Sequence, residues 1–98
     1  MYVVIFKAKL DRRDGDYIST ASKLRKSAVN EYNCREFISF NEGNFELTLS
    51  YWQSLKDIKK WKADAAHQIA QVKGKQKWYQ FYQVQIAKIE KEYKSNQS

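Results

Sequence analysis

The sequence predicts an α+β domain with the element order β-α-β-β-α-β. Three observations carry this prediction: four short segments are rich in β-branched and aromatic residues, two longer segments show helical spacing, and a hairpin loop joins the middle strands. This order is that of the ferredoxin-like arrangement, in which an antiparallel sheet carries both helices on one face. With 98 residues, the chain is long enough for one domain with one modest core.

The N-terminal part of the chain supplies a strand and a helix. Residues 2–10 read as a strand, and its better candidates for the core side are the alternating positions Tyr2, Val4, Phe6, Ala8 and Leu10. A polar loop over residues 11–16 ends in Asp16, which we expect to cap the helix. The helix is expected from Tyr17 to about Tyr32, because apolar residues recur every three or four positions at Ile18, Ala21, Leu24, Ala28 and Val29.

The two middle strands form the clearest local pattern. They are expected over residues 35–41 and Phe45–Trp52, where apolar and polar residues alternate. Between them lies a polar loop of residues 41–44, and Gly43 can adopt the positive φ that such a turn requires. This spacing predicts a β-hairpin.

The second helix and the last strand follow the hairpin. Ser54 is a suitable N-cap for a helix that we expect to end at Val72, with Gly74 as its stop, and its apolar positions are Leu55, Ile58, Trp61, Ala65, Ile69 and Val72. Residues 78–89 end as a strand with Trp78, Tyr82, Val84 and Ile86 on one side. We therefore expect a domain over residues 1–93 and a polar tail over residues 94–98.

Charge and cysteine content limit the classes of function. The net charge is +7, and residues 53–77 hold seven Lys against two Asp. This cluster on the second helix is typical of a solvated helix face, although it could also attract anions or nucleic acid. The single cysteine, Cys34, excludes an intrachain disulfide and a cysteine-based zinc site. No apolar run is long enough for a membrane span, so a cytoplasmic location is expected.

The aromatic content predicts a homodimer. Seven Tyr, five Phe and three Trp exceed what one face of a small sheet needs, and two helices cover only that face. We expect the helix-facing core to centre on Ile18, Leu24, Leu55 and Ile58, and the outward large residues to include Trp52, Phe81 and Ile89. A twofold sheet-to-sheet contact would cover these outward residues and bury more than about 1,200 Å² in total.

Several segments together resemble the antibiotic biosynthesis mono-oxygenase (ABM) family of dimeric α+β barrels. They are residues 2–10, the hairpin that ends in Leu49-Ser50-Tyr51-Trp52, Trp61 six residues before His67, residues 70–74, Trp78-Tyr79 with Tyr82, and residues 89–93. The resemblance covers about residues 2–93. It implies a dimer, and an enzyme that oxidises polycyclic aromatic substrates with dioxygen and without metal or flavin, or one that cleaves haem.

Haem cleavage is not expected. The resemblance implies that members of the haem-cleaving branch carry a triad. It consists of an Asn on the first strand, a Trp on the second helix and a His about ten positions later. Trp61 matches the Trp, but the corresponding later position is Gln71 and the first strand contains no Asn. Two of the three groups are therefore missing.

Five residues are candidates for a site on this fold. His67 is the catalytic candidate, as the only side chain with an unperturbed pKa near neutrality, although helical geometry turns it away from Trp61 toward a surface that it shares with Asp64 and Gln71. The pocket candidates are Trp61, Gln71, Trp78 and Tyr82. Trp61 and Trp78 could equally be core residues, and a Tyr82 hydroxyl could bind a substrate phenol. No spacing of ligands predicts a metal or cofactor site.

Three functions remain in competition. The first is a cofactor-independent mono-oxygenase that acts on a small aromatic compound with dioxygen. The second is a non-catalytic dimeric module of the same fold that binds a ligand or has a stress-related role. Single-stranded nucleic-acid binding ranks last, because residues 2–6 lack the basic-Gly-aromatic pattern of an RNA-recognition strand. We therefore expect a homodimer with a small aromatic substrate and no nucleic-acid or membrane partner.

Overall fold

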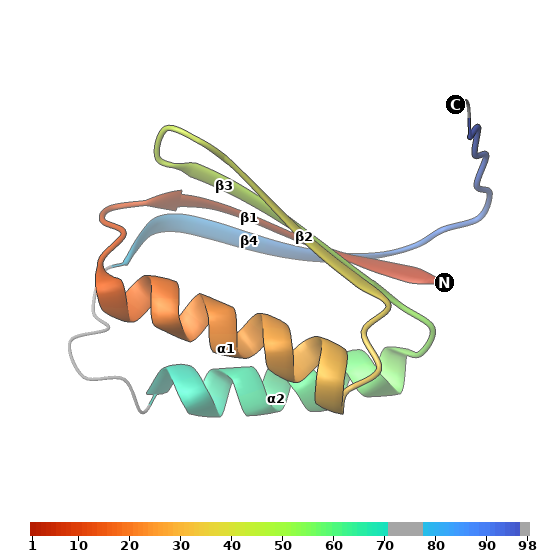
Figure 1. Cartoon of the computed structure of the whole chain (residues 1–98), viewed down its shortest axis with the longest axis horizontal. Coiled ribbons are helices and arrows are strands. Elements are labelled where there is room, and N and C mark those ends of the chain that lie inside the picture. Colours follow the sequence, from red (N-terminus) through yellow and green to blue (C-terminus); the bar gives the residue numbers. More distant parts are fainter. Residues whose placement is uncertain (71–77, 97–98) are drawn as a thin grey trace.

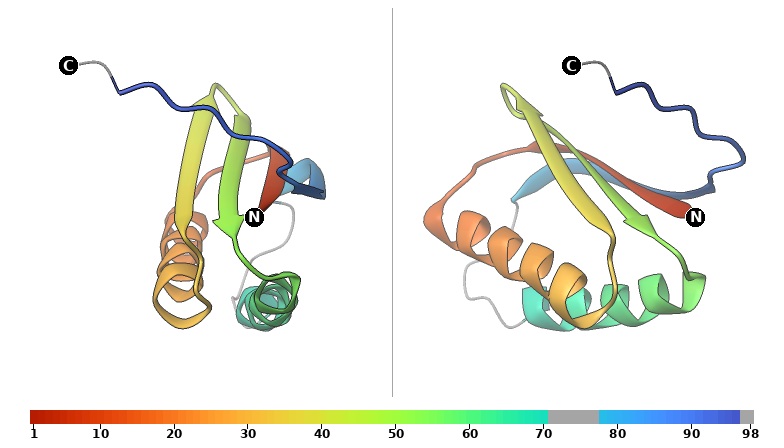
Figure 2. Two further views of the ribbon diagram at one scale, coloured as in Figure 1. Left: turned by 90° about the vertical axis from the view of Figure 1, so that its right-hand side faces the viewer. Right: turned by 45° about the vertical axis from the view of Figure 1, so that its right-hand side comes forward.

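The computed structural model describes residues 1–70 and 78–96, and within them it has the predicted element order (Figure 1). The elements are β1 (Tyr2–Leu10), α1 (Gly15–Glu31), β2 (Glu36–Glu42), β3 (Phe45–Trp52), α2 (Leu55–Ala70) and β4 (Tyr79–Lys88). The four strands form an antiparallel sheet of order β2-β3-β1-β4, and the two helices lie side by side on one face of it (Figure 2). The predicted ferredoxin-like fold is confirmed.

The first helix begins two residues earlier than expected. Its N-cap is Asp14 and not Asp16, since the Asp14 side chain accepts a hydrogen bond from the backbone N–H of Tyr17. Asp16 instead lies in the first turn, where an acidic side chain interacts favourably with the helix dipole. Asn33, just past the C-cap at Tyr32, has a φ of +64°, a conformation that Asn tolerates better than most residues.

The second helix begins where the sequence predicts. The Ser54 hydroxyl accepts hydrogen bonds from the backbone N–H groups of Lys56, at 3.1 Å, and Asp57, at 3.4 Å, which confirms the predicted cap. The expected end of this helix at Val72 and its stop at Gly74 lie outside the described residues. Within residues 1–70 and 78–96, no helix is both long and apolar enough to cross a bilayer.

The core contains fewer helix residues than the apolar spacing predicts. One cluster of buried residues consists of Val4, Ala28, Cys34, Trp52 and Ile58, and a second consists of Leu10, Tyr17 and Trp78. Ile18 and Leu55, which we expected at the centre of the helix-facing core, are 56% and 50% exposed. On α1 the reason is rotation: Tyr17 packs edge-on against Trp78, and the next residue points about 100° away around the helix.

The register of the sheet determines which side chains face the helices. Val4 pairs with Ser50 and Phe6 with Thr48, and directly opposed residues share a face. The face that includes Val4, here called the helix-side face, therefore receives Glu46, Thr48, Ser50 and Trp52 from β3. Trp52 is fully buried in the core and does not point outward, so the prediction that it lies on the dimer face is wrong.

The opposite side of the sheet, here called the outer face, exposes several large apolar side chains. It carries Phe45, Leu47, Leu49 and Tyr51 from β3, with Phe40 from β2 and Phe81 from β4. Phe40, Phe45 and Phe81 are each at least half exposed. The prediction of large apolar residues on the side away from the helices is thus confirmed for Phe81.

The last strand, β4, lies at one edge of the sheet and pairs only with β1. After Tyr79, all the side chains of β4 are exposed, whichever face of the sheet they lie on. Residues 89–96 form no helix or strand and leave the body of the molecule, and Tyr93 there is 87% exposed (Figure 2). The domain boundary at residue 93 stays a prediction.

Candidate functional site

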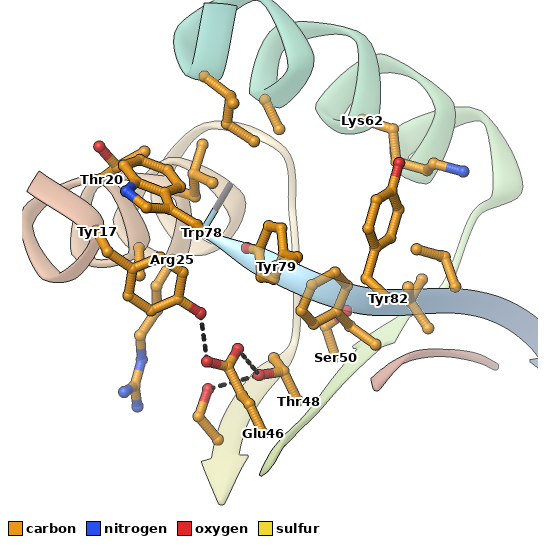
Figure 3. A pocket seen from close by; sticks show the side chains of 18 of the residues that line it. Tyr17, Thr20, Arg25, Glu46, Thr48, Ser50, Lys62, Trp78, Tyr79 and Tyr82 are labelled. Carbon is orange, nitrogen blue, oxygen red and sulfur yellow. Dashed lines mark hydrogen bonds between the residues drawn. The ribbon is translucent and has the colours of Figure 1, made fainter. Parts of the chain in front are cut away.

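A pocket of about 1020 Å³ lies between the helix-side face of the sheet and the two helices (Figure 3). Both helices and all four strands contribute to its lining. Its aromatic lining residues are Phe6, Tyr17, Phe37, Trp61, Trp78, Tyr79, Phe81 and Tyr82. A volume of this size is at the upper end of the range for small-molecule sites.

The pocket exists because small side chains occupy the positions that would otherwise fill it. Ser39, Thr48 and Ser50 project from the sheet, while Thr20, Ala21 and Ala65 face them from the helices. Protein interiors are close-packed, so short side chains on both layers leave a space that no neighbouring side chain reaches. The pocket between the layers therefore results from the short side chains of the sheet and of the two helices.

A carboxylate forms the polar centre of the pocket. The Tyr17 hydroxyl donates a hydrogen bond to one oxygen of Glu46, and the Thr48 hydroxyl donates to the other at 3.1 Å (Figure 3). The Ser39 and Thr48 hydroxyls are in turn hydrogen-bonded, at 2.9 Å. The four groups of this network come from α1, β2 and β3, so the network joins the helix layer to the sheet.

The tyrosines next to Glu46 remain protonated at physiological pH. Burial, followed by the hydrogen bond to Glu46, raises the pKa of Tyr17 far above its ordinary value. Burial likewise raises the pKa of Tyr79, whose ring contacts that of Tyr17 edge-on with centroids 5.9 Å apart. Tyr17 is therefore a fixed donor, and Glu46 accepts its hydrogen bond.

Aromatic rings that contact one another form the apolar walls. Trp61 is held by a hydrogen bond from its indole N–H to the Leu24 carbonyl, at 3.1 Å, and its ring lies 5.5 Å from that of Trp52. On the β1–β4 side, Phe6 and Tyr82 stack with centroids 6.1 Å apart and an interplanar angle of 22°. The walls thus offer flat apolar surfaces at both sides of the pocket.

The structure brings three of the five candidate residues together. Trp61, Trp78 and Tyr82 line the pocket, whereas His67 is exposed on α2 and does not line it. Gln71 lies outside the described residues. In the part of the chain that the structure describes, no three His, Cys, Asp or Glu side chains are grouped to hold a metal ion.

Sequence reasoning did not find Glu46, Tyr17 or Thr48. A signal was present in β3, where Glu46, Thr48 and Ser50 alternate with large apolar residues and share a face with Trp52. That alternation marks one face as polar, but the sequence does not say that the polar face is the one beneath the helices. Only the register with β1 settles this.

Two curated proteins are similar to this chain in sequence. The uncharacterized protein YqjZ of Bacillus subtilis is 32% identical over 92 residues, which cover 93% of this chain and 81% of that protein. The jasmonate monooxygenase ABM of Pyricularia oryzae is 28% identical over 101 residues, which cover 99% of this chain and 47% of that protein. The chain therefore spans about half the length of the second relative. No family model matches the chain.

Solved structures share the fold at low sequence identity. A Deinococcus radiodurans crystal structure that is classed with the antibiotic biosynthesis monooxygenases has a TM-score of 0.71 at 9% identity, over 99% of this chain and all of that one. A variant of MhuD with two manganese protoporphyrin IX molecules bound per active site has a TM-score of 0.65 at 12% identity, over 97% of this chain and all of that one.

The element order, the sheet order and the pocket between sheet and helices define a ferredoxin-like α+β domain. Together with the sequence relatives, they identify the family. The chain belongs to the antibiotic biosynthesis monooxygenase family, as the residues of its strands and second helix predict.

Proposed function

We propose that the protein is a mono-oxygenase that oxidises a small aromatic compound with dioxygen and needs no bound cofactor. The observation that carries this proposal is the pocket, whose walls are aromatic rings and whose volume is about 1020 Å³. A filled core would have contradicted the proposal. The name of the Pyricularia oryzae relative, a monooxygenase, supports the reaction class.

In this reaction the substrate itself supplies the electrons. Loss of a proton leaves an electron-rich anion that reduces dioxygen, and oxidation of a CH₂ group to a carbonyl consumes one O₂ and releases one water. The protein has to exclude water, hold the substrate rings and supply hydrogen-bonding groups. Trp61 on α2 and the Phe6–Tyr82 pair on the sheet provide the flat surfaces for those rings.

Haem is not the substrate that this chain favours. The MhuD variant shows that the fold can hold a porphyrin, but the likeness at 12% identity concerns the fold alone. Of the Asn, Trp and His of the haem-cleaving branch, this chain has the Trp at Trp61, while β1 contains no Asn. The position that corresponds to the His is Gln71.

Oxygen uptake tests the proposal most directly. A panel of flat phenolic compounds is first screened for thermal stabilisation of the full chain, and the compounds that bind are then assayed with and without dioxygen. We expect turnover in air and none under anaerobic conditions, with Trp61→Ala reducing it at least about tenfold because a wall of the pocket is lost. Ile18→Ala is the control, since Ile18 is exposed and outside the pocket. Turnover that continues without dioxygen would contradict the proposal.

A second candidate is a non-catalytic dimeric module that binds an aromatic ligand. The same pocket supports it, and it requires no reaction. The same assay separates the two functions, because such a module would be stabilised by its ligand but would consume no dioxygen in its presence.

We propose in addition that the protein is a homodimer joined through the outer face. Phe40, Phe45, Leu47 and Phe81 are exposed there and come from β2, β3 and β4. Burying each side chain of this size contributes roughly 1.5–3 kcal/mol. A second copy with the same apolar surface would cover all four residues at once.

A further inference from the structure

The pocket contains an acidic group whose surroundings are unusual for a carboxylate. Glu46 lines the pocket from the hairpin end of β3, and its hydrogen-bond partners are the neutral hydroxyls of Tyr17 and Thr48. Among residues 1–70 and 78–96, the ion pair found joins Arg12 to Asp14, so no basic side chain there pairs with Glu46. Among the described residues, the groups that donate to its carboxylate are therefore hydroxyls.

Glu46 still has room for a further donor. An ionised carboxylate offers about four acceptor positions on its two oxygens, and Tyr17 and Thr48 occupy one position on each oxygen. The remaining positions are free to accept from a ligand in the pocket, which Glu46 lines and whose walls are mainly aromatic. A ligand that places a hydroxyl hydrogen beside Glu46 can fill one of them.

We propose that Glu46 is a ligand-binding residue that selects aromatic compounds bearing a phenolic or enolic hydroxyl group. The inference rests on the proposed function of the pocket as an aromatic-ligand site, and it adds the substrate class. The ring of the ligand lies against the aromatic walls, and its hydroxyl donates a hydrogen bond to the carboxylate. Tyr17 and Thr48 act as positioning residues because they fix both oxygens of Glu46.

Charge argues for a neutral hydroxyl at this position and against an acidic group. An anionic group placed beside Glu46 would meet a like charge, whereas a neutral hydroxyl would not. The basic side chains that line the pocket, Arg25 and Lys62, are both exposed, and they come from the helices. An acidic substituent is therefore favoured beside these two basic side chains and not beside Glu46.

A purely structural role for Glu46 makes a different prediction. If the residue served only to join α1 to the sheet through Tyr17, its replacement would change stability without changing the relative affinities of two ligands. The ratio of the affinities for two ligands therefore distinguishes a binding role of Glu46 from a purely structural one.

A matched pair of ligands tests the proposal on the full chain. We would measure the affinities of 2-naphthol and its methyl ether, 2-methoxynaphthalene, by quenching of tryptophan fluorescence, since Trp61 and Trp78 line the pocket. A hydrogen bond to a charged group predicts that wild type binds the naphthol about tenfold more tightly. In Glu46→Gln we expect this ratio to fall to about twofold while the affinity for the ether is kept. Glu42→Gln is the control, because it removes the same charge from the exposed outer face.

Each outcome bears on a different claim. Equal affinities in wild type, or an unchanged ratio in Glu46→Gln, would overturn the role of Glu46 and leave the aromatic pocket intact; the wild-type ratio decides this even where the variant does not fold. Failure of both compounds to bind wild type would overturn the aromatic-ligand site and the role of Glu46 with it. Discrimination without oxygen uptake would contradict only the mono-oxygenase and would support the role of Glu46.

Discussion

On β3, most residues of the two faces have compositions opposite to those expected of a small monomeric domain. The helix-side face of β3 carries Glu46, Thr48 and Ser50, whereas its outer face carries Phe45, Leu47 and Leu49. A sheet that packs helices on one side normally places its apolar residues beneath them and its polar residues in water. Along β3, three polar residues lie beneath the helices, next to Trp52, and the apolar residues lie outside.

This arrangement on β3 indicates that the two faces of the sheet serve different functions. Short polar side chains beneath the helices leave a pocket and place a carboxylate in it, at the expense of the core. Large apolar side chains on the outer face, such as Phe45 and Leu47, are exposed and suit contact with a second copy. Packing on the helix-side face then depends on the few large residues at its ends, chiefly Trp52.

The largest effect is expected for Trp52→Ala, because this substitution removes the main core residue of the helix-side face. Trp52 is fully buried, and its indole N–H donates a hydrogen bond to the Ser50 hydroxyl at 2.8 Å. Loss of such a side chain lowers the free energy of unfolding by about 3–5 kcal/mol, which urea denaturation measures. Its neighbour Tyr51 points to the outer face, so Tyr51→Ala should cost clearly less in the monomer. Equal losses would mean that the two faces do not differ as described.

A charge on the outer face should separate the subunits without unfolding them. In Leu47→Lys we expect the apparent mass in sedimentation to fall from that of a dimer to that of an 11.7 kDa chain. The lost burial is worth roughly 1.5–3 kcal/mol for each subunit. Ile18→Lys introduces the same charge at an exposed position on α1 and should leave the dimer unchanged. A wild-type chain that sediments as a folded monomer at micromolar concentration would refute the dimer.

Removing the hydroxyl of Tyr17 tests the polar centre of the helix-side face. Tyr17→Phe deletes the donor to Glu46 but keeps the ring against Trp78, so the free energy of unfolding should fall by about 1–2 kcal/mol. The same substitution at Tyr82, whose side chain is 61% exposed, should change it by less than about 0.5 kcal/mol. If chemical denaturation gives the same value for both variants, the Tyr17–Glu46 hydrogen bond contributes nothing to stability.

The smallest effect concerns the rate at which Cys34 reacts with a thiol reagent. The Cys34 thiol is buried with Trp52 and donates to the Glu36 carbonyl, and burial raises its pKa above the ordinary value. Because only the thiolate reacts, modification at pH 8 should be slow and should accelerate as the pH rises toward that pKa. Modification of Cys34 should stay slow in Leu47→Lys and should become fast in Trp52→Ala. A slow rate in Trp52→Ala would show that the helix-side core does not depend on Trp52.

Local features of the fold could be predicted from the sequence. The bounds of β1 and β3, the hairpin and the cap at Ser54 follow from residues that are neighbours in the chain. The cap of α1 was misplaced because Asp14 and Asp16 are equally suitable residue types, and their backbone conformations decide between them.

The candidate site was predicted only in part, because it depends on pairing between distant strands. Trp61, Trp78 and Tyr82 were identified as aromatic residues of the right segments, and the pocket does contain them. Glu46 was missed, since its place beneath the helices follows from its pairing with Ala8 of β1. A strand that alternates polar and apolar residues has two possible orientations, and its own residues do not choose between them.

The position of β1 has a consequence for synthesis of the chain. This strand is made first, yet it lies in the interior of the sheet and pairs with β3 on one side and β4 on the other. While the ribosome is still making α2, β1 has only one of its two neighbours, and the backbone groups of its second edge are unpaired. Folding must therefore be completed after translation reaches β4, and a nascent chain stalled before Tyr79 presents an edge that can pair with other chains.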